Sequence, residues 1–112
     1  MYEKSEELVK KLFSGKLDKG GYPYLDHLYE VSNIVTSEDA KIVGLLHDVL
    51  EDTETTSEDL LEMGYSEFIV STIEILTRGA KEDYDDYIER IIKSNNKIAL
   101  EVKLADLKHN NM

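Results

Sequence analysis

The sequence predicts an all-α fold, a bundle of about six helices with short connections. Apolar residues recur three and four positions apart along most of the chain, which is the period of a helix with one buried face. Residues that cap or end helices stand between these stretches, and strand-like alternation is nearly absent. The 112 residues suffice for one domain, and a content of 41% hydrophobic and 33% charged residues is typical of a globular protein.

The first three predicted helices each begin or end at a recognisable residue. The first covers residues 3–13 and stops before the turn-rich loop SGKLDKGGYP, and the second extends from residue 24 to about 35. Ser37, followed by two acidic residues, is a typical N-cap for a third helix that continues to about Asp52. These helices form the N-terminal half of the predicted bundle.

The C-terminal half is predicted to contain further helices separated by caps and glycines. Thr56 and Asp59 have the spacing of a capping box in which aspartate replaces glutamate, and Gly64 closes this short helix. Ser66 caps the next helix, which is expected to stop near Gly79. The last two helices are expected from residue 84 and from residue 95 or 96.

The composition limits the partners and the chemistry of the chain. The formal net charge is −11, so a nucleic acid is repelled unless a basic patch overrides the field, and no such patch is visible. Because cysteine is absent, any metal ion must be held by nitrogen and oxygen. No apolar run approaches the ~20 residues that cross a bilayer, so we expect a cytoplasmic protein without membrane or nucleic-acid partners.

The stretch GLLHDVLEDT places four ionisable groups in an apolar helix. His47 lies four residues after Val43 and therefore points to the buried face, while Asp48 stands about 100° further round, at the edge of that face. Glu51 and Asp52 follow one turn later. Buried or half-buried carboxylates are costly unless they are paired or bind a metal ion, so this helix requires a compensating cation.

His27 and Asp106 repeat the anomaly on the second and the last predicted helix, where each lies four residues from an apolar valine. If these helices are neighbours, two imidazoles and two carboxylates converge with coordination positions left open. This ligand set suits Mn²⁺, Fe²⁺ or Zn²⁺, and open positions favour catalysis over a closed structural site. The candidate metal ligands are therefore His27, His47, Asp48 and Asp106.

Each candidate also has an ordinary interpretation. A single histidine is more often a satisfied core or surface residue than a ligand, and Asp106 alone is compatible with an exposed carboxylate. The third histidine, His109, keeps that ordinary interpretation, because Asp106 and Asn110 on the same helix fit a site better. Glu51 and Asp52 would be unfavourable at a helix C-terminus for electrostatic reasons, so they require another explanation, and handling a metal-activated water provides one.

Four segments of the chain resemble the HD-domain phosphohydrolases, namely PYLDH, LLHDVLEDT, TTSEDL and VKLADLKHN. The resemblance is strongest to the hydrolase domain of RelA/SpoT-type enzymes and their small single-domain relatives, and it extends from about Gly15 to Asn110. It implies an all-helical HD domain that removes the 3′-pyrophosphate from ppGpp and pppGpp and uses Mn²⁺.

The resemblance also implies roles for individual residues. His27, His47, Asp48 and Asp106 would bind Mn²⁺, while Glu51 and Asp52 match paired acids that orient or activate the attacking water. Asn110 matches an asparagine near the nucleotide. The implied reaction is attack of a metal-bound hydroxide on the phosphorus at the 3′ oxygen, with release of pyrophosphate.

Two departures from the family pattern concern the substrate. The loop before PYLDH usually carries an arginine that stacks on guanine, but Asp18 stands at that position, and Leu28 replaces a proline that commonly follows the first histidine. Family members also continue into a further helix, which leaves open a truncation after Met112 or an unusually open pocket. The sequence therefore defines the nucleotide less sharply than it defines the metal.

The remaining candidates for substrate binding are cations and one aromatic residue. Lys19, Arg78 and Lys103 are candidates for phosphate or base contacts, although each is more typical of a solvated cation. Tyr24 either lines the pocket or packs in the core, and we favour packing. Two alternatives to a (p)ppGpp hydrolase stay open, a phosphohydrolase of another nucleotide and a non-catalytic domain that senses a metal ion or nucleotide.

Overall fold

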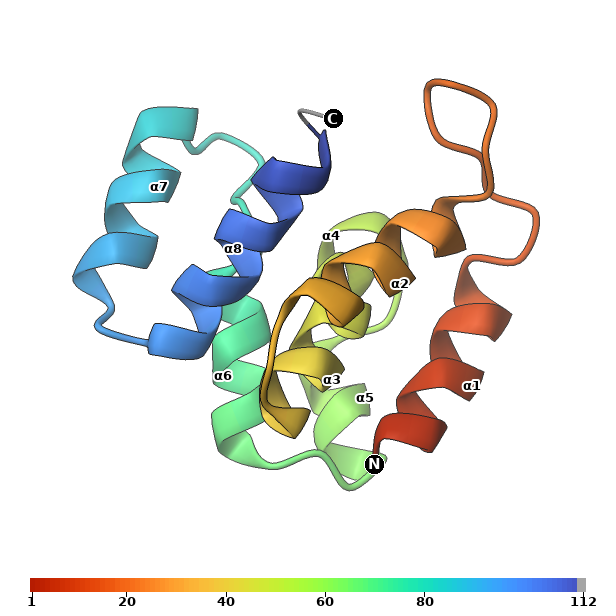
Figure 1. The fold of residues 1–112 in the computed structure, drawn as a ribbon. Helices are drawn as coiled ribbons and strands as arrows, with labels where there is room; N and C mark the ends of the chain where they lie inside the picture. The colour runs from red at the N-terminus through yellow and green to blue at the C-terminus, as the bar shows by residue number, and fades with distance from the viewer. Residues whose placement is uncertain (111–112) are drawn as a thin grey trace.

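The computed structural model describes residues 1–110 apart from the side chain of Asn110, and this part of the chain is an all-α bundle, as predicted (Figure 1). Its helices are α1 (Tyr2–Leu12), α2 (Tyr24–Ile34), α3 (Glu38–Leu46), α4 (Val49–Asp52), α5 (Ser57–Glu62), α6 (Glu67–Ile75), α7 (Tyr84–Lys93) and α8 (Lys97–Asn110). None of the helices in the described part is long and apolar enough to cross a membrane.

Helix α3 is the centre of the bundle. It packs against α1, α2, α6 and α8, and six of its nine residues are buried. Because α2 and α8 also pack against each other, the three helices enclose one apolar core. The start of α2, the end of α3 and the last turns of α8 come together at one end of the molecule (Figure 1).

The caps predicted from the sequence are present. The Ser37 side chain accepts a hydrogen bond from the Ala40 amide, and the Ser66 side chain accepts one from the Ile69 amide. A complete capping box joins Thr56 to the third residue of α5 through two reciprocal hydrogen bonds. The sequence therefore predicted these helix starts through side chains that accept amide protons which the helix leaves unsatisfied.

The prediction that the third helix continues to Asp52 is wrong, because the helix breaks at His47 and Asp48. The His47 ring donates from Nδ1 to the Gly44 carbonyl at 2.7 Å, and a continuous helix would give that carbonyl to the Asp48 amide. Asp48 adopts φ −100° and ψ 0°, between the helical and extended regions. The chain therefore turns here and restarts as the short helix α4.

The sixth helix also ends earlier than predicted, at Ile75 instead of near Gly79. The Arg90 guanidinium donates to the carbonyls of Ile75 and Thr77 at 2.9 and 3.1 Å, and it pairs with Glu82 at 2.9 Å. These contacts satisfy the terminal carbonyls of α6 without continuing the helix. Residues 76–83 consequently form a loop held against α7.

Gly44 sets the distance between α2 and α3. A Cβ atom at this position would lie 3.1 Å from the Cα atom and 3.2 Å from the backbone nitrogen of Ser32. Both atoms belong to the α2 backbone, which cannot swing aside as a side chain does. This close approach holds the helix that carries His27 next to the helix that ends at His47.

We expect Gly44→Ala to destabilise the protein although alanine favours helix formation. The gain in helix propensity of about 1 kcal/mol is outweighed by overpacking against the α2 backbone, which leaves a net loss of about 1–2 kcal/mol. Urea unfolding measures this change, and the exposed Ser71→Ala in α6 serves as the control. A Gly44→Ala protein as stable as the control would contradict the close-packing interpretation.

Candidate metal centre

The four predicted metal ligands lie together at one end of the bundle. One ligand atom each from His27, His47 and Asp48 lies within 4.8 Å of the others. Asp106 Oδ1 lies 2.8 Å from His27 Nε2 and 3.5 Å from His47 Nε2. Three helical segments that are far apart in sequence therefore direct two imidazoles and two carboxylates at the same point.

His47 presents its Nε2 ring nitrogen to this cluster. Its Nδ1 carries the proton donated to the Gly44 carbonyl, which leaves the lone pair of the neutral ring on Nε2. Nε2 is buried and has no hydrogen-bond partner among the described residues, although Asp48 Oδ2 lies 3.2 Å away. A buried nitrogen lone pair beside carboxylates fits a divalent cation, so these residues suit a metal ion.

The electrostatics of the cluster also call for positive charge. Burial lowers the pKa of His47, but the carboxylates of Asp48 and Asp106 outweigh that effect and raise this pKa to about 9. Burial raises the pKa of Asp106, but the His27 ring at 2.8 Å and the nearby His47 and Lys103 reverse this effect and hold the pKa well below its usual range. Without a metal ion the site thus favours a protonated imidazole, and a bound cation would replace that proton.

Lys103, a predicted contact of the substrate, lies against the predicted metal ligand Asp106 instead of in open solvent. Its Nζ is 3.1 Å from Asp106 Oδ2 and 5.1 Å from the centre of the Tyr87 ring. Burial lowers the pKa of Lys103, but Asp106 and the tyrosines of α7 more than compensate and raise it. The ammonium group therefore orients the carboxylate of Asp106 and offsets part of its charge.

Tyr24 is half-buried and packs against the core, and it also contacts the predicted metal ligand Asp48. Its ring stacks on Phe13 with a centroid distance of 5.4 Å, and its hydroxyl donates a hydrogen bond to Asp48 Oδ2. Burial, followed by the negative charge of Asp48, raises the pKa of this phenol. Tyr24 therefore remains a donor and fixes the orientation of the Asp48 carboxylate.

The paired acids Glu51 and Asp52 stand on α4, one turn beyond the ligands, and both are exposed. Burial and then the charges of Asp48 and Asp52 raise the pKa of Glu51, while Lys103 and His47 oppose the rise. Asp52 Oδ2 lies 3.5 Å from Lys16 Nζ, which in turn lies 4.8 Å from the centre of the Tyr24 ring. The helix break brings both acids to the rim of the site.

An open cleft of about 520 Å³ begins at Glu51. Its walls are residues of α4 and of the loop after α6: Leu50, Glu51, Thr77, Arg78, Gly79 and Ala80. Arg78 donates from Nε to the Glu82 carbonyl at 2.8 Å, and its guanidinium lies 5.6 Å from the centre of the Tyr84 ring. The predicted substrate contact Arg78 and the predicted catalytic acid Glu51 thus line one cleft, which begins three residues after the predicted metal ligand Asp48.

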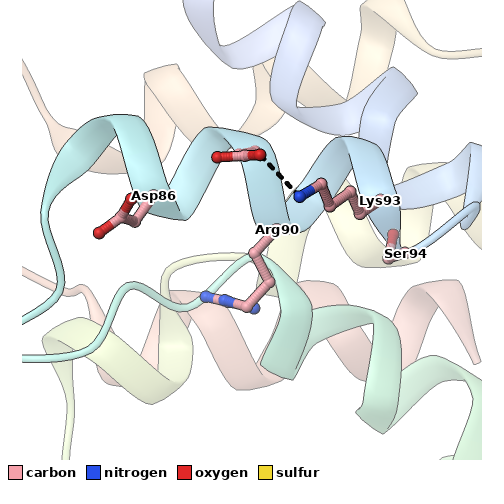
Figure 2. A pocket seen from close by; sticks show the side chains of 5 residues that line it. Asp86, Arg90, Lys93 and Ser94 are labelled. Atoms are coloured by element: carbon pink, nitrogen blue, oxygen red, sulfur yellow. Dashed lines mark ion pairs between the residues drawn. The ribbon is translucent and has the colours of Figure 1, made fainter.

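A second groove, of about 470 Å³, runs along α7 (Figure 2) and contains none of the predicted site residues. Its five lining residues belong to α7 and its C-cap, and Lys93 pairs with Glu89 at 2.7 Å. A single helix does not enclose a ligand. We therefore assign the functional site to the end of the bundle that carries His27 and His47.

Two further predicted substrate contacts are Lys19 and Asn110. Lys19 is exposed in the loop between α1 and α2, and the side chain of Asn110 lies outside the described part of the chain. Asp18, at the position of the expected arginine, accepts hydrogen bonds from the amides of Gly20 and Tyr22 at 2.9 Å each. Its carboxylate thus organises the turn.

Sequence reasoning missed two residues beside the site. Lys16 contacts Asp52 from a loop, where helical periodicity gives no signal. His109, interpreted as an ordinary histidine, lies with its Nδ1 atom 2.7 Å from Nδ1 of His27. Its position three residues after Asp106, on the same helix face, was the available signal.

The chain is similar to parts of much longer proteins. It is 35% identical over 116 residues to a GTP pyrophosphokinase of Myxococcus xanthus, an alignment that covers 89% of this chain and 15% of that protein. Guanosine-3′,5′-bis(diphosphate) 3′-pyrophosphohydrolases of Borreliella burgdorferi and Haemophilus influenzae are 35% and 29% identical, over 67% and 92% of this chain. The chain spans only 12–17% of the length of these relatives. No family model matches it.

The fold is also known from a solved structure. A metazoan ortholog of SpoT, described as hydrolysing ppGpp and acting in starvation responses, superposes with a TM-score of 0.74 at 24% identity. The superposition covers 94% of this chain and 65% of that one. An all-α bundle with a histidine–aspartate cluster of this kind defines an HD-type domain. The relatives in sequence and the neighbour in fold identify it as an HD-type domain of the SpoT hydrolase-like family.

We expect Tyr24→Phe to weaken metal binding while leaving the fold intact. The variant keeps the ring that stacks on Phe13 but loses the hydrogen bond that orients Asp48, and losses of such supporting bonds typically cost 10- to 100-fold in metal affinity, so a loss of about 10-fold is expected. Calorimetric titration with Mn²⁺ measures the affinity. Tyr22→Phe removes an exposed hydroxyl from the preceding loop and should bind as the wild type does; equal affinities in both variants would contradict the role of Tyr24.

Proposed function

We propose that the chain is a metal-dependent phosphohydrolase that removes the 3′-pyrophosphate of (p)ppGpp. The observation that carries this proposal is the buried His47 Nε2, which has no hydrogen-bond partner among the described residues and lies amid His27, Asp48 and Asp106, with two acids on the next turn. The relatives named as guanosine-3′,5′-bis(diphosphate) 3′-pyrophosphohydrolases support the reaction and the substrate. A cytoplasmic location stays a prediction from the sequence.

We infer that the metal ion is Mn²⁺ or a similar divalent transition ion. The two nitrogen and two oxygen donors that would hold it are typical of borderline ions, and the chain offers no thiolate that would favour a softer ion. When bound, such an ion polarises the phosphoryl group and lowers the pKa of water. Its charge would also offset the repulsion between an acidic protein and a polyphosphate.

We assign to Glu51 the role of the general base that accepts the proton of the attacking water. It stands one turn after His47, lines the cleft, and has a raised pKa, which brings a carboxylate closer to the range where it accepts protons efficiently. Asp52, held near Lys16, is assigned to orienting the same water. Glu51 thus acts on the water from the side of the cleft, and Asp52 acts from the side of Lys16.

We assign to Arg78 the binding of those phosphate groups of the substrate that do not react. It lines the cleft together with Glu51, so a polyphosphate whose reacting phosphorus lies at the metal centre can extend along this wall. A guanidinium group binds phosphate oxygens with paired hydrogen bonds. Lys103 and Lys16 add positive charge on the sides of Asp106 and Asp52.

Asp18 favours a second candidate substrate, another nucleotide polyphosphate. Its carboxylate accepts hydrogen bonds from the turn amides. It cannot stack on a guanine base as the planar guanidinium cation of an arginine does. Assay of ppGpp beside a panel of nucleoside phosphates and 3′,5′-bisphosphates with Mn²⁺ separates the two. Release of pyrophosphate from ppGpp is expected, and turnover of a panel member without turnover of ppGpp would transfer the proposal to that substrate.

Glu51→Gln should abolish turnover and retain the metal. Loss of a general base typically costs 10²- to 10⁴-fold, so we expect kcat to fall by about 100-fold or more while the bound-metal stoichiometry stays that of the wild type. The exposed Glu54→Gln, three residues further on, changes the same charge and should leave kcat unaltered. Unchanged turnover in Glu51→Gln would remove Glu51 from the proton transfer, whereas absence of turnover in the wild type would favour a non-catalytic sensor.

Arg78→Ala should raise KM more than it lowers kcat. Removal of a charge-assisted contact to a phosphate costs about 1.5 kcal/mol, which corresponds to a rise of about 10-fold in KM. Steady-state kinetics of the variant beside Lys81→Ala isolates the effect, because Lys81 carries the same charge on the same loop but does not line the cleft. Equal KM values for the two variants would place the phosphates elsewhere.

A further inference from the structure

The rings of His109 and His27 lie within hydrogen-bond distance of each other. Their Nδ1 atoms are 2.7 Å apart, the ring centres are 4.9 Å apart, and the ring planes differ by 32°. Two lone pairs repel each other at this distance, so one of the two nitrogens carries hydrogen and the other accepts it. The contact joins the first turn of α2 to the last turns of α8.

The proposed metal ion determines which ring donates. The His27 atom that faces the cluster is Nε2, 2.8 Å from Asp106 Oδ1, and a nitrogen that binds a metal ion must be free of its proton. The proton of a neutral His27 ring then resides on Nδ1, where His109 Nδ1 is the acceptor at hydrogen-bond distance. His109 in that state carries its own proton on Nε2.

We propose that His109 is a positioning residue that accepts a hydrogen bond from His27 Nδ1 and thereby fixes the tautomer and orientation of that ligand. The inference rests on the proposed metal site and is independent of which nucleotide is hydrolysed. It assigns His27 the same kind of support that the Gly44 carbonyl gives to His47. Such partners of ligating histidines raise their basicity and hold the ring in place.

The two histidine ligands differ in where their support originates. His47 donates to a carbonyl of its own helix, three residues earlier, so its orientation is set when α3 forms. His27 depends on a side chain that lies 82 residues away in sequence, so its orientation is set only when α8 packs against α2. The His27 ring is therefore the ligand whose geometry a single side-chain substitution can release.

Two substitutions at His109 separate its hydrogen bond from its packing. His109→Leu fills much of the space of the ring without an acceptor, whereas His109→Asn places an acceptor oxygen near the position of Nδ1. Calorimetric titration with Mn²⁺ is expected to show an affinity 10- to 100-fold weaker for His109→Leu, and close to the wild-type affinity for His109→Asn. The exposed neighbour Lys108→Ala is the control and should bind as the wild type does.

The tautomer itself is observed by nitrogen NMR of protein labelled at histidine and loaded with diamagnetic Zn²⁺. His27 is expected to be protonated at Nδ1 and metal-bound through Nε2 in the wild type. Thermal unfolding of the metal-free variants checks that each one folds. If His109→Leu does not fold, the NMR spectrum of the wild type and the titration of His109→Asn still decide the question.

Different failures would identify different errors. Absence of any divalent-ion binding by the wild type would overturn the proposed function together with this inference. Wild-type affinity in a folded His109→Leu protein, equal losses in His109→Leu and His109→Asn, or a metal-bound His27 that lacks a proton on Nδ1 would overturn the role of His109 alone.

Discussion

The candidate site depends on one hydrogen bond, from the His47 ring to the Gly44 carbonyl. This bond takes an acceptor that a continuous helix would use, and the chain breaks between α3 and α4. The same bond assigns the ring proton to Nδ1 and leaves Nε2 to face the cluster. It thus connects the path of the backbone to the chemistry of a ligand, and it brings Glu51 and Asp52 to the rim on a separate short helix.

The carboxylates of the candidate site lie at a partly buried end of the bundle, where negative charge is costly. Each of them has a specific partner of opposite charge or a hydrogen-bond donor. Tyr24 donates to Asp48, Lys103 lies beside Asp106, and Lys16 lies near Asp52. These partners orient the carboxylates and reduce their mutual repulsion. None of them contacts the buried His47 Nε2, which has no hydrogen-bond partner among the described residues. Without a compensating cation, such a cluster of buried carboxylates would strongly destabilise the fold. Its presence in a folded bundle therefore favours a bound cation over a purely structural role.

Helical periodicity predicted the fold class and the inward direction of His27, His47 and Asp106, because residues three and four apart share a face whatever the tertiary structure. Their convergence was expected only on the condition that the three helices are neighbours. It could not predict the break at His47, where a side chain competes with the backbone for one carbonyl, or the early end of α6, where Arg90 of another helix takes the carbonyls. The contacts of Lys16 and His109 were missed for a related reason. Their partners belong to other elements, so the pairing itself leaves no period in the sequence, although the helix face that His109 shares with Asp106 does.

The contacts of Arg90 with the loop after α6 have a consequence for the cleft beside Glu51. Because Arg90 binds the carbonyls of Ile75 and Thr77 and also pairs with Glu82, it anchors both ends of the loop that carries Arg78. A loop that is anchored at both ends keeps its conformation when a ligand binds. Little conformational entropy is then lost on binding, so the affinity of this cleft reflects its contacts with the ligand instead of the cost of ordering a lid.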